Sequence, residues 1–188
     1  NAITTGNPIL FEPNSKKAVS EVKNLLVLGG SLGAKKINEV IPHIKTPVNI
    51  WHQTGKSHFD EVKALYSKSD HHQVKLDPFI SNMSEAYAWA DLVVCRAGAM
   101  TVSELIATKT IAILIPFPYA IDNHQTVNAQ YLTKREAGII IDEQNLTPEA
   151  LDKQISQLDS EKLKEMSKNL GSLKVQYPER LIADYLLN

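Results

Sequence analysis

The chain has 188 residues, a formal net charge of −1, and average proportions of apolar (43%) and charged (22%) residues. These values exclude a disordered, collagen-like or coiled-coil chain, and they argue against nucleic acid as a partner, because binding to phosphate backbones usually requires a basic excess. No apolar run approaches the roughly 20 residues of a membrane-spanning helix. The single cysteine, Cys95, cannot form an internal disulfide, which favours a reducing compartment.

Short apolar runs alternate with longer amphipathic segments along the chain. Strands that are apolar throughout need both faces covered, and intervening helices suit parallel pairing. The sequence therefore predicts an α/β fold, a doubly wound parallel sheet of about six strands. In chain order we expect a strand at 25–28, a helix at 34–41, a strand at 48–51, a helix at 56–67, a strand at 74–76, a helix at 82–89 capped by Asn82, a strand at 92–95, a helix at 101–108, a strand at 111–115, a helix at 123–133, a strand at 138–141 and three closing helical stretches.

Both ends of the chain differ from this alternating pattern. Residues 1–23 contain Gly6-Asn7-Pro8 and Pro13-Asn14-Ser15, which are typical of turns and linkers, so we expect a hinge to another domain. After Pro178, apolar residues between Tyr177 and Leu186 fall on one helical face, which could pack on this domain or on an absent one. The expected organisation is a linker at 1–23, a ligand-binding domain at 24–172 and a C-terminal helix at 173–188.

The first motif is Gly29-Gly30-Ser31-Leu32-Gly33-Ala34, at a strand-to-helix junction. Glycines there let backbone N–H groups approach an anion closely, and Ser31 adds a donor, although a tight turn without a ligand has the same composition. The glycine spacing differs from a dinucleotide fingerprint, and the second strand ends at Trp51-His52-Gln53 without an acid.

Residues 29–33 also match the Gly-x-Ser-x-Gly elbow of hydrolases. Ser31 would be the nucleophile, with Asp122 and His124 following in the expected order. That elbow normally has strands before it that supply an oxyanion hole, whereas one strand precedes Ser31 here. A hydrolase therefore remains a less favoured alternative.

The second and third motifs also follow predicted strands. In residues 95–104, backbone donors from Ala99 to Thr101 would meet a phosphate, and Glu104 could accept a hydrogen bond from a ribose diol. The alternative is that Glu104 only stabilises the helix dipole and that Thr101 is an N-cap.

In residues 116–129, side chains with paired donors and acceptors suit sugar hydroxyls. The simpler alternative is a helix capped by Asp122 with its polar residues facing water. Because ligands collect at the carboxyl edge of such sheets, the three loops predict one site.

The remaining polar residues suggest no further site. His52, His58, His71 and His72 lack the spacing of metal ligands, so we expect surface histidines and no metal. Cys95 ends a buried strand and is expected to be an inert thiol rather than a nucleophile.

Taken together, these motifs closely resemble the MurG family of bacterial N-acetylglucosaminyltransferases. The resemblance also includes Ile50 to Gly55, Phe79-Ile80-x-x-Met83 and Ala86 to Asp91, runs from about Gly6 to Ile141, and covers only the C-terminal, donor-binding half of that family. It implies one Rossmann-like half of a GT-B transferase that binds UDP-N-acetylglucosamine, requires no metal or cofactor, and takes part in converting lipid I to lipid II in peptidoglycan synthesis.

The resemblance also implies a role for each matching residue. The backbone of Ile80 would bind uracil, with Phe79 and Met83 lining that pocket, and Glu104 would hold the ribose diol. The diphosphate would meet the phosphate loop at Gly29, Gly30 and Gly33. The remaining implied contacts are Ser31, Ala99, Met100 and Thr101 to the diphosphate, and Gln125, with His124 and Asn123, to the hexosamine.

The general base and the lipid acceptor groove of this family belong to its N-terminal half, so no catalytic residue is expected in this chain, which should be inactive alone. The full-length protein would lie peripherally on the cytoplasmic face of the inner membrane. Leu10 replaces the arginine that the family usually has near the donor. Two alternatives remain: a separate donor-binding subunit of a two-chain transferase, and a non-catalytic nucleotide-sugar-binding module.

Overall fold

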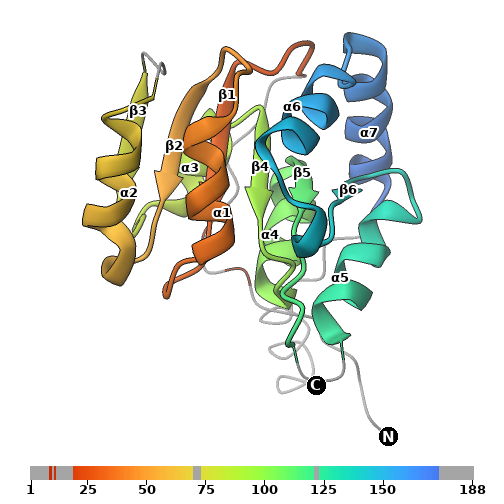
Figure 1. Cartoon of the computed structure of the whole chain (residues 1–188). Coiled ribbons are helices and arrows are strands. Elements are labelled where there is room, and N and C mark those ends of the chain that lie inside the picture. The colour runs from red at the N-terminus through yellow and green to blue at the C-terminus, as the bar shows by residue number, and fades with distance from the viewer. Residues whose placement is uncertain (1–8, 10, 12–18, 70–72, 121–122, 174–188) are drawn as a thin grey trace, which may run out of the picture.

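The computed structural model describes residues 9, 11, 19–69, 73–120 and 123–173 (Figure 1). Each predicted strand and helix within these ranges is present, with ends within two residues of those expected, except that the first turn of the helix at 56–67 is a 3-10 helix. The elements are β1 (Asn24–Leu28), α1 (Lys35–Val40), η1 (Ile41–His43), β2 (Asn49–Gln53), η2 (Lys56–His58), α2 (Phe59–Tyr66), β3 (Val74–Asp77), α3 (Met83–Trp89), β4 (Leu92–Cys95), α4 (Ala99–Thr108), β5 (Ile111–Leu114), α5 (His124–Thr133), β6 (Ile139–Ile140), η4 (Glu143–Asn145), α6 (Pro148–Ser156) and α7 (Ser160–Ser172).

The described strands form one six-stranded parallel sheet in the order β3-β2-β1-β4-β5-β6. This is the Rossmann order, and it confirms the doubly wound sheet that the sequence predicts. Leu28 of β1 is in register with Gln53 of β2 and with Cys95 of β4. The central strands therefore end at the same edge, and the chain reverses its direction of sheet growth between β1 and β4.

The apolar strands form the core. All residues of β4 and β5 and four of the five in β1 are buried, as full coverage of both sheet faces requires. Burial of each Leu, Val or Ile side chain contributes roughly 1.5–3 kcal/mol, so these strands specify the sheet strongly. Helix α1 contacts α2, while α4 contacts both α3 and α5, and Figure 1 shows α1 in front of the sheet.

Two helix starts affect the site. The Asn82 side chain accepts a hydrogen bond from the Glu85 N–H at 3.2 Å, which confirms the predicted cap of α3. Helix α4 begins two residues earlier than predicted, with Gly98 as its N-cap. Thr101 is the third residue of this helix, so its alternative role as an N-cap is wrong.

Described residues of the expected linker, among them Phe11, Val19 and Val22, pack on the domain. Val19 is buried in the core, and the Phe11 ring stacks on the Tyr87 ring with centroids 5.9 Å apart. Helices α6 and α7 are the first two closing helices that the sequence predicts. The third, in the 173–188 segment, lies outside the described residues except for Leu173. Leu10 also lies outside the described residues. Across the described ranges, no helix is both long and apolar enough to cross a bilayer.

Candidate functional site

A cavity of about 850 Å³ opens at the carboxyl edge of the sheet, where the strand order reverses between β1 and β4. In doubly wound sheets this reversal leaves a crevice for ligands. Loops that follow β1, β3, β4 and β5 all contribute to its walls. The predicted residues that line it are Gly29, Gly30, Ser31, Gly33, Phe79, Ile80, Met83, Thr101, Glu104 and Gln125. Ala99, Met100, Asn123 and His124 are not on the lining.

The glycine turn after β1 depends on close backbone packing. Gly33 has a φ of +81°, and a Cβ there would collide with the Thr54 carbonyl oxygen. A Cβ on Gly55 would lie 2.5 Å from the Gly33 nitrogen. The turn therefore rests directly on the backbone that follows β2, which leaves the exposed Ser31 facing the cavity opening.

Gln53 joins two walls of the cavity. Its Nε2 donates to the Gly30 carbonyl at 3.1 Å, and its Oε1 accepts from the Ile80 N–H at 2.9 Å. The Ile80 N–H is therefore already bonded within the protein. Gln53 had no predicted role, although its position at the carboxyl end of a strand is a signal that could have identified it.

Gly98 and Thr101 place the N-terminus of α4 at the wall of the cavity. Its first helical hydrogen bond runs from the Val102 N–H to the Gly98 carbonyl at 3.0 Å. The N–H groups of Ala99, Met100 and Thr101 precede that bond and have no partner within the helix. Together with the helix dipole, they favour an anion at this end of the ten-residue helix.

Glu104, one turn further along α4, is held by Tyr87 of α3. The Tyr87 hydroxyl donates to Glu104 Oε2 at 2.8 Å. Burial raises the pKa of Glu104, and the hydrogen bond from Tyr87 partly offsets that increase. Burial, and then the nearby Glu104 charge, raises the pKa of Tyr87 well above its ordinary value, so Tyr87 remains a neutral donor. Tyr87 lies in the motif at residues 86–91, but the sequence predicted no role for it.

Hydrogen bonds join the loop after β5 to helix α5, and α5 to the loop after β4. The Phe117 N–H donates to Gln125 Oε1 at 3.0 Å, and Asn128 Nδ2 donates to the Ala97 carbonyl at 3.0 Å. Asn123 precedes α5 in a left-handed conformation with a φ of +52° and makes no side-chain cap. Asp122 lies outside the described residues, so the Asp-capped alternative is not tested.

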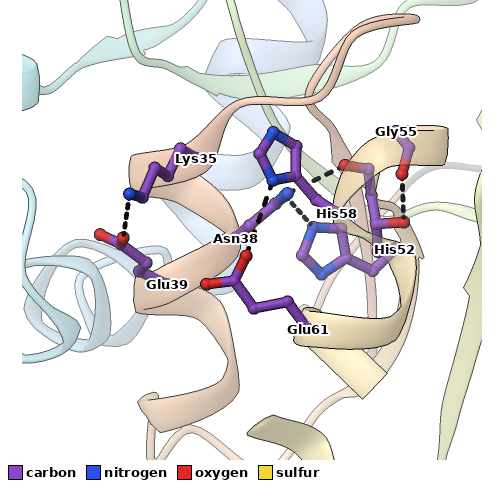
Figure 2. Close-up of polar contacts among 8 residues, drawn as sticks. Lys35, Asn38, Glu39, His52, Gly55, His58 and Glu61 are labelled. Atoms are coloured by element: carbon purple, nitrogen blue, oxygen red, sulfur yellow. Dashed lines mark hydrogen bonds and ion pairs between the residues drawn. The ribbon is translucent and has the colours of Figure 1, made fainter. Parts of the chain in front are cut away.

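The prediction that His52 is a surface histidine is wrong. His52 is fully buried, with Nε2 3.0 Å from Asn38 Oδ1 (Figure 2). Its Nδ1 lies 3.0 Å from the Tyr66 hydroxyl. Asn38 Nδ2 donates to the Thr54 carbonyl at 2.9 Å, so Asn38 Oδ1 must accept from His52. His52 is thus the neutral Nε2–H tautomer and accepts from Tyr66. It was misplaced because β2 is covered on both faces, which its polar sequence obscures.

Of the predicted surface histidines His58, His71 and His72, the structure describes only His58. His58 is half-buried, 3.8 Å from Glu61 (Figure 2), and His71 and His72 lie outside the described residues. No group of three or more potential metal-binding side chains occurs in the part of the chain that the structure describes.

Cys95 is buried as predicted, and burial raises the pKa of its thiol. Ser31 lines the cavity without His124, which does not favour a hydrolase triad.

Comparison with known proteins identifies similar sequences. The model of the glycosyltransferase family 28 C-terminal domain matches residues 24–181. A UDP-N-acetylglucosamine–N-acetylmuramyl-(pentapeptide) pyrophosphoryl-undecaprenol N-acetylglucosamine transferase from Vesicomyosocius okutanii is 49% identical over the whole chain and is covered over 54% of its own length. The enzyme of the same name from Cupriavidus pinatubonensis is 40% identical over 96% of this chain, again with 54% of its length covered.

Solved structures agree with this relationship. MurG from Acinetobacter baumannii superposes with a TM-score of 0.80 at 34% identity, over 90% of this chain and 50% of that one. The glycosyltransferase VinC, solved with dTDP, has a TM-score of 0.62 at 15% identity over 91% of this chain and 42% of its own, and shows a shared fold alone. The chain spans about half the length of the relatives that it matches.

Proposed function

Because the chain belongs to glycosyltransferase family 28, as its C-terminal domain, we propose that it is the donor-binding half of an inverting N-acetylglucosaminyltransferase. Its donor would be UDP-N-acetylglucosamine and its acceptor lipid I, giving lipid II for peptidoglycan. The acceptor and its membrane contact would belong to an N-terminal domain, which would place the full-length protein peripherally on the cytoplasmic face of the inner membrane. The observation that carries the proposal is one cavity lined by Ser31, Thr101, Glu104 and Gln125.

The nucleoside would lie between the loop after β3 and helix α4. Glu104 is placed to accept hydrogen bonds from the ribose hydroxyls, and Tyr87 fixes its carboxylate. Phe79 and Met83 would contact the uracil ring. Since the Ile80 N–H bonds to Gln53, we assign recognition of the uracil N3–H to the Ile80 carbonyl.

The diphosphate would lie between the glycine turn and the start of α4. The turn offers Ser31, and the helix offers the N–H groups of Ala99, Met100 and Thr101. Charge-assisted hydrogen bonds to such donors are about twice as strong as neutral ones. Lys35 and Lys36 also line the cavity. Their positive charge would stand in for the family arginine that Leu10 replaces.

The sugar would extend toward Gln125, with His124 and Asn123 beside it at the start of α5. In the reaction, the acceptor 4-hydroxyl would attack the anomeric carbon while the bond to the diphosphate breaks. The helix N-terminus would stabilise the negative charge that develops on departing UDP. The base that takes the hydroxyl proton would come from the N-terminal domain.

Calorimetric titration with UDP tests the nucleotide pocket. We expect the wild-type chain to bind UDP, and Glu104→Ala to weaken UDP binding about tenfold or more, since loss of a charged hydrogen-bond acceptor costs about 1.5–3 kcal/mol. Pyrophosphate lacks a ribose, so its affinity should be the same in both proteins. Glu104→Gln retains the side-chain volume and should show a smaller loss.

Glu161→Ala, an exposed carboxylate in the first turn of α7, is the matched control and should bind UDP as the wild type does. Equal losses of UDP and pyrophosphate in Glu104→Ala would show that the residue does not read the ribose. A wild-type chain that fails to bind UDP would refute the proposed function itself.

A further inference from the structure

Arg96 lines the proposed donor cavity but directs its guanidinium to the protein rather than to a ligand. Its Nη1 donates to the carbonyls of Ile115 at 3.2 Å and Pro116 at 3.4 Å. Its Nη2 forms an ion pair with Glu143 of η4. Only 15% of the Arg96 side chain and 19% of the Glu143 side chain are exposed. An arginine beside a diphosphate site would ordinarily be assigned to the phosphates, so these contacts require another explanation.

The contacts of Arg96 converge on the turn that follows β5. Besides the two carbonyls, the guanidinium carbon lies 5.2 Å from the centroid of the Phe117 ring. Arg96 therefore contacts three consecutive residues, Ile115 to Phe117. Glu143 pairs with the guanidinium and offsets its charge.

The turn at 115–117 also orients Gln125. The Phe117 N–H donates to Gln125 Oε1 at 3.0 Å, so the carboxamide oxygen is committed to the turn. The remaining donor of the carboxamide, Nε2, is then the group available to a sugar hydroxyl in the cavity that Gln125 lines. A continuous series of contacts thus runs from Glu143 through Arg96 and Phe117 to Gln125.

We propose that Arg96 and Glu143 are a positioning pair for sugar recognition: they fix the turn at 115–117, and through it the carboxamide of Gln125. The inference rests on the proposed function, because it assumes that the cavity takes a nucleotide sugar. A buried ion pair gains stability only with good geometry and further hydrogen bonds, whereas it can fix one arrangement of the groups around it. Arg96 is therefore a residue that acts through Gln125 and not a ligand of the diphosphate.

The test compares the affinities of UDP and UDP-N-acetylglucosamine by calorimetry in the wild type, Arg96→Lys, Glu143→Gln and the double variant. The informative quantity is the ratio of the two affinities, since overall destabilisation would change both together. We expect each single variant to bind UDP within twofold of the wild type and to lose at least fivefold in UDP-N-acetylglucosamine affinity. Because the two residues act as a unit, the double variant should lose no more than Arg96→Lys alone.

Two variants anchor the comparison. Gln125→Ala should reproduce the selective loss of sugar-nucleotide affinity. Glu165→Gln removes an exposed ion pair with Lys162 on α7, 3.3 Å in length, and should leave the ratio unchanged. Thermal unfolding of each protein verifies that it is folded, and Glu143→Gln preserves side-chain size if Arg96→Lys does not fold.

The outcomes separate this proposal from the proposed function. An Arg96→Lys protein that loses UDP affinity, more strongly at low salt, would show that Arg96 contacts the diphosphate and would overturn the positioning role. An unchanged ratio in both single variants would overturn it as well. A wild type that binds neither ligand would refute both proposals, whereas normal UDP binding with an unchanged ratio would refute the positioning pair alone.

Discussion

At the scale of single residues, His52 shows how strongly surroundings control protonation. Its two ring nitrogens bond to Asn38 and Tyr66 in a fully buried site. Burial lowers the pKa of His52 from 6.5 to about 3. The imidazole therefore serves as a neutral link between α1, β2 and α2, rather than as a group that changes charge near neutral pH.

This pKa predicts a pH-dependent stability. Between pH 6.5 and about 3, the unfolded chain takes up a proton at His52 while the folded chain does not. The contribution to stability is present above pH 6.5 and is lost as the pH falls, by about 1.4 kcal/mol per pH unit. Urea unfolding at a series of pH values measures the free energy of unfolding and its slope.

His52→Gln should be less stable at neutral pH, because it disturbs the buried hydrogen bonds, and should show a shallower decline below pH 6.5. The exposed His43 provides the matched control, and His43→Gln should retain the wild-type slope. If the His52→Gln and wild-type slopes are equal, the folded and unfolded chains take up the His52 proton over the same pH range, and burial does not lower this pKa as described.

At the scale of elements, the glycine turn and the backbone after β2 form one packed unit. Gly30 and Gly33 have nearly the same φ, +80° and +81°, but different surroundings. A Cβ on Gly30 would meet nothing within 4 Å, whereas a Cβ on Gly33 would collide with the Thr54 carbonyl. The pair therefore separates the cost of a left-handed backbone from the cost of steric contact.

We predict that Gly30→Ala lowers the free energy of unfolding by about 1–2 kcal/mol, the cost of placing a Cβ in the left-handed region. Gly33→Ala should cost roughly 3–4 kcal/mol, because the turn must also move away from Thr54. Chemical denaturation measures both values. Equal costs for the two variants would show that the turn does not rest on the backbone after β2 as described.

The buried strands and the start of α3 were predictable from the sequence, whereas the start of α4 was not. The buried strands were found because runs such as Leu92 to Cys95 leave no polar face, and Asn82 marked the start of α3. The start of α4 was misplaced because Gly98 caps it without a side-chain hydrogen bond. The cavity was found because parallel strands share a carboxyl edge.

The supports of the site residues were not predictable in the same way. Gln53, Tyr87 and the pair of Arg96 and Glu143 are linked to their partners by contacts between segments far apart in the sequence. Helical or strand periodicity carries no information about such partners. The sequence therefore indicated many of the residues that line the cavity, although Ala99, Met100, Asn123 and His124 do not line it. The structure was needed to show what holds the others.

At the scale of the whole molecule, the chain matches about half the length of its relatives, and its cavity lies at one edge of one sheet. We predict that it binds UDP-N-acetylglucosamine but transfers no sugar to lipid I, since the base and the acceptor groove would belong to the other half. A turnover assay with both substrates measures this, with Acinetobacter baumannii MurG as the positive control. Sustained transfer by the 188-residue chain alone would contradict the prediction.

The strand order also has a consequence during synthesis. As the chain leaves the ribosome, β1, β2 and β3 emerge first and can pair as neighbours, whereas β4 and β5 must later join on the far side of β1. The walls of the cavity are complete only after Glu143 has emerged. Cellular nucleotide can therefore bind the complete cavity only once about four-fifths of the 24–172 domain has been made, and the earlier stages of folding proceed without help from the ligand.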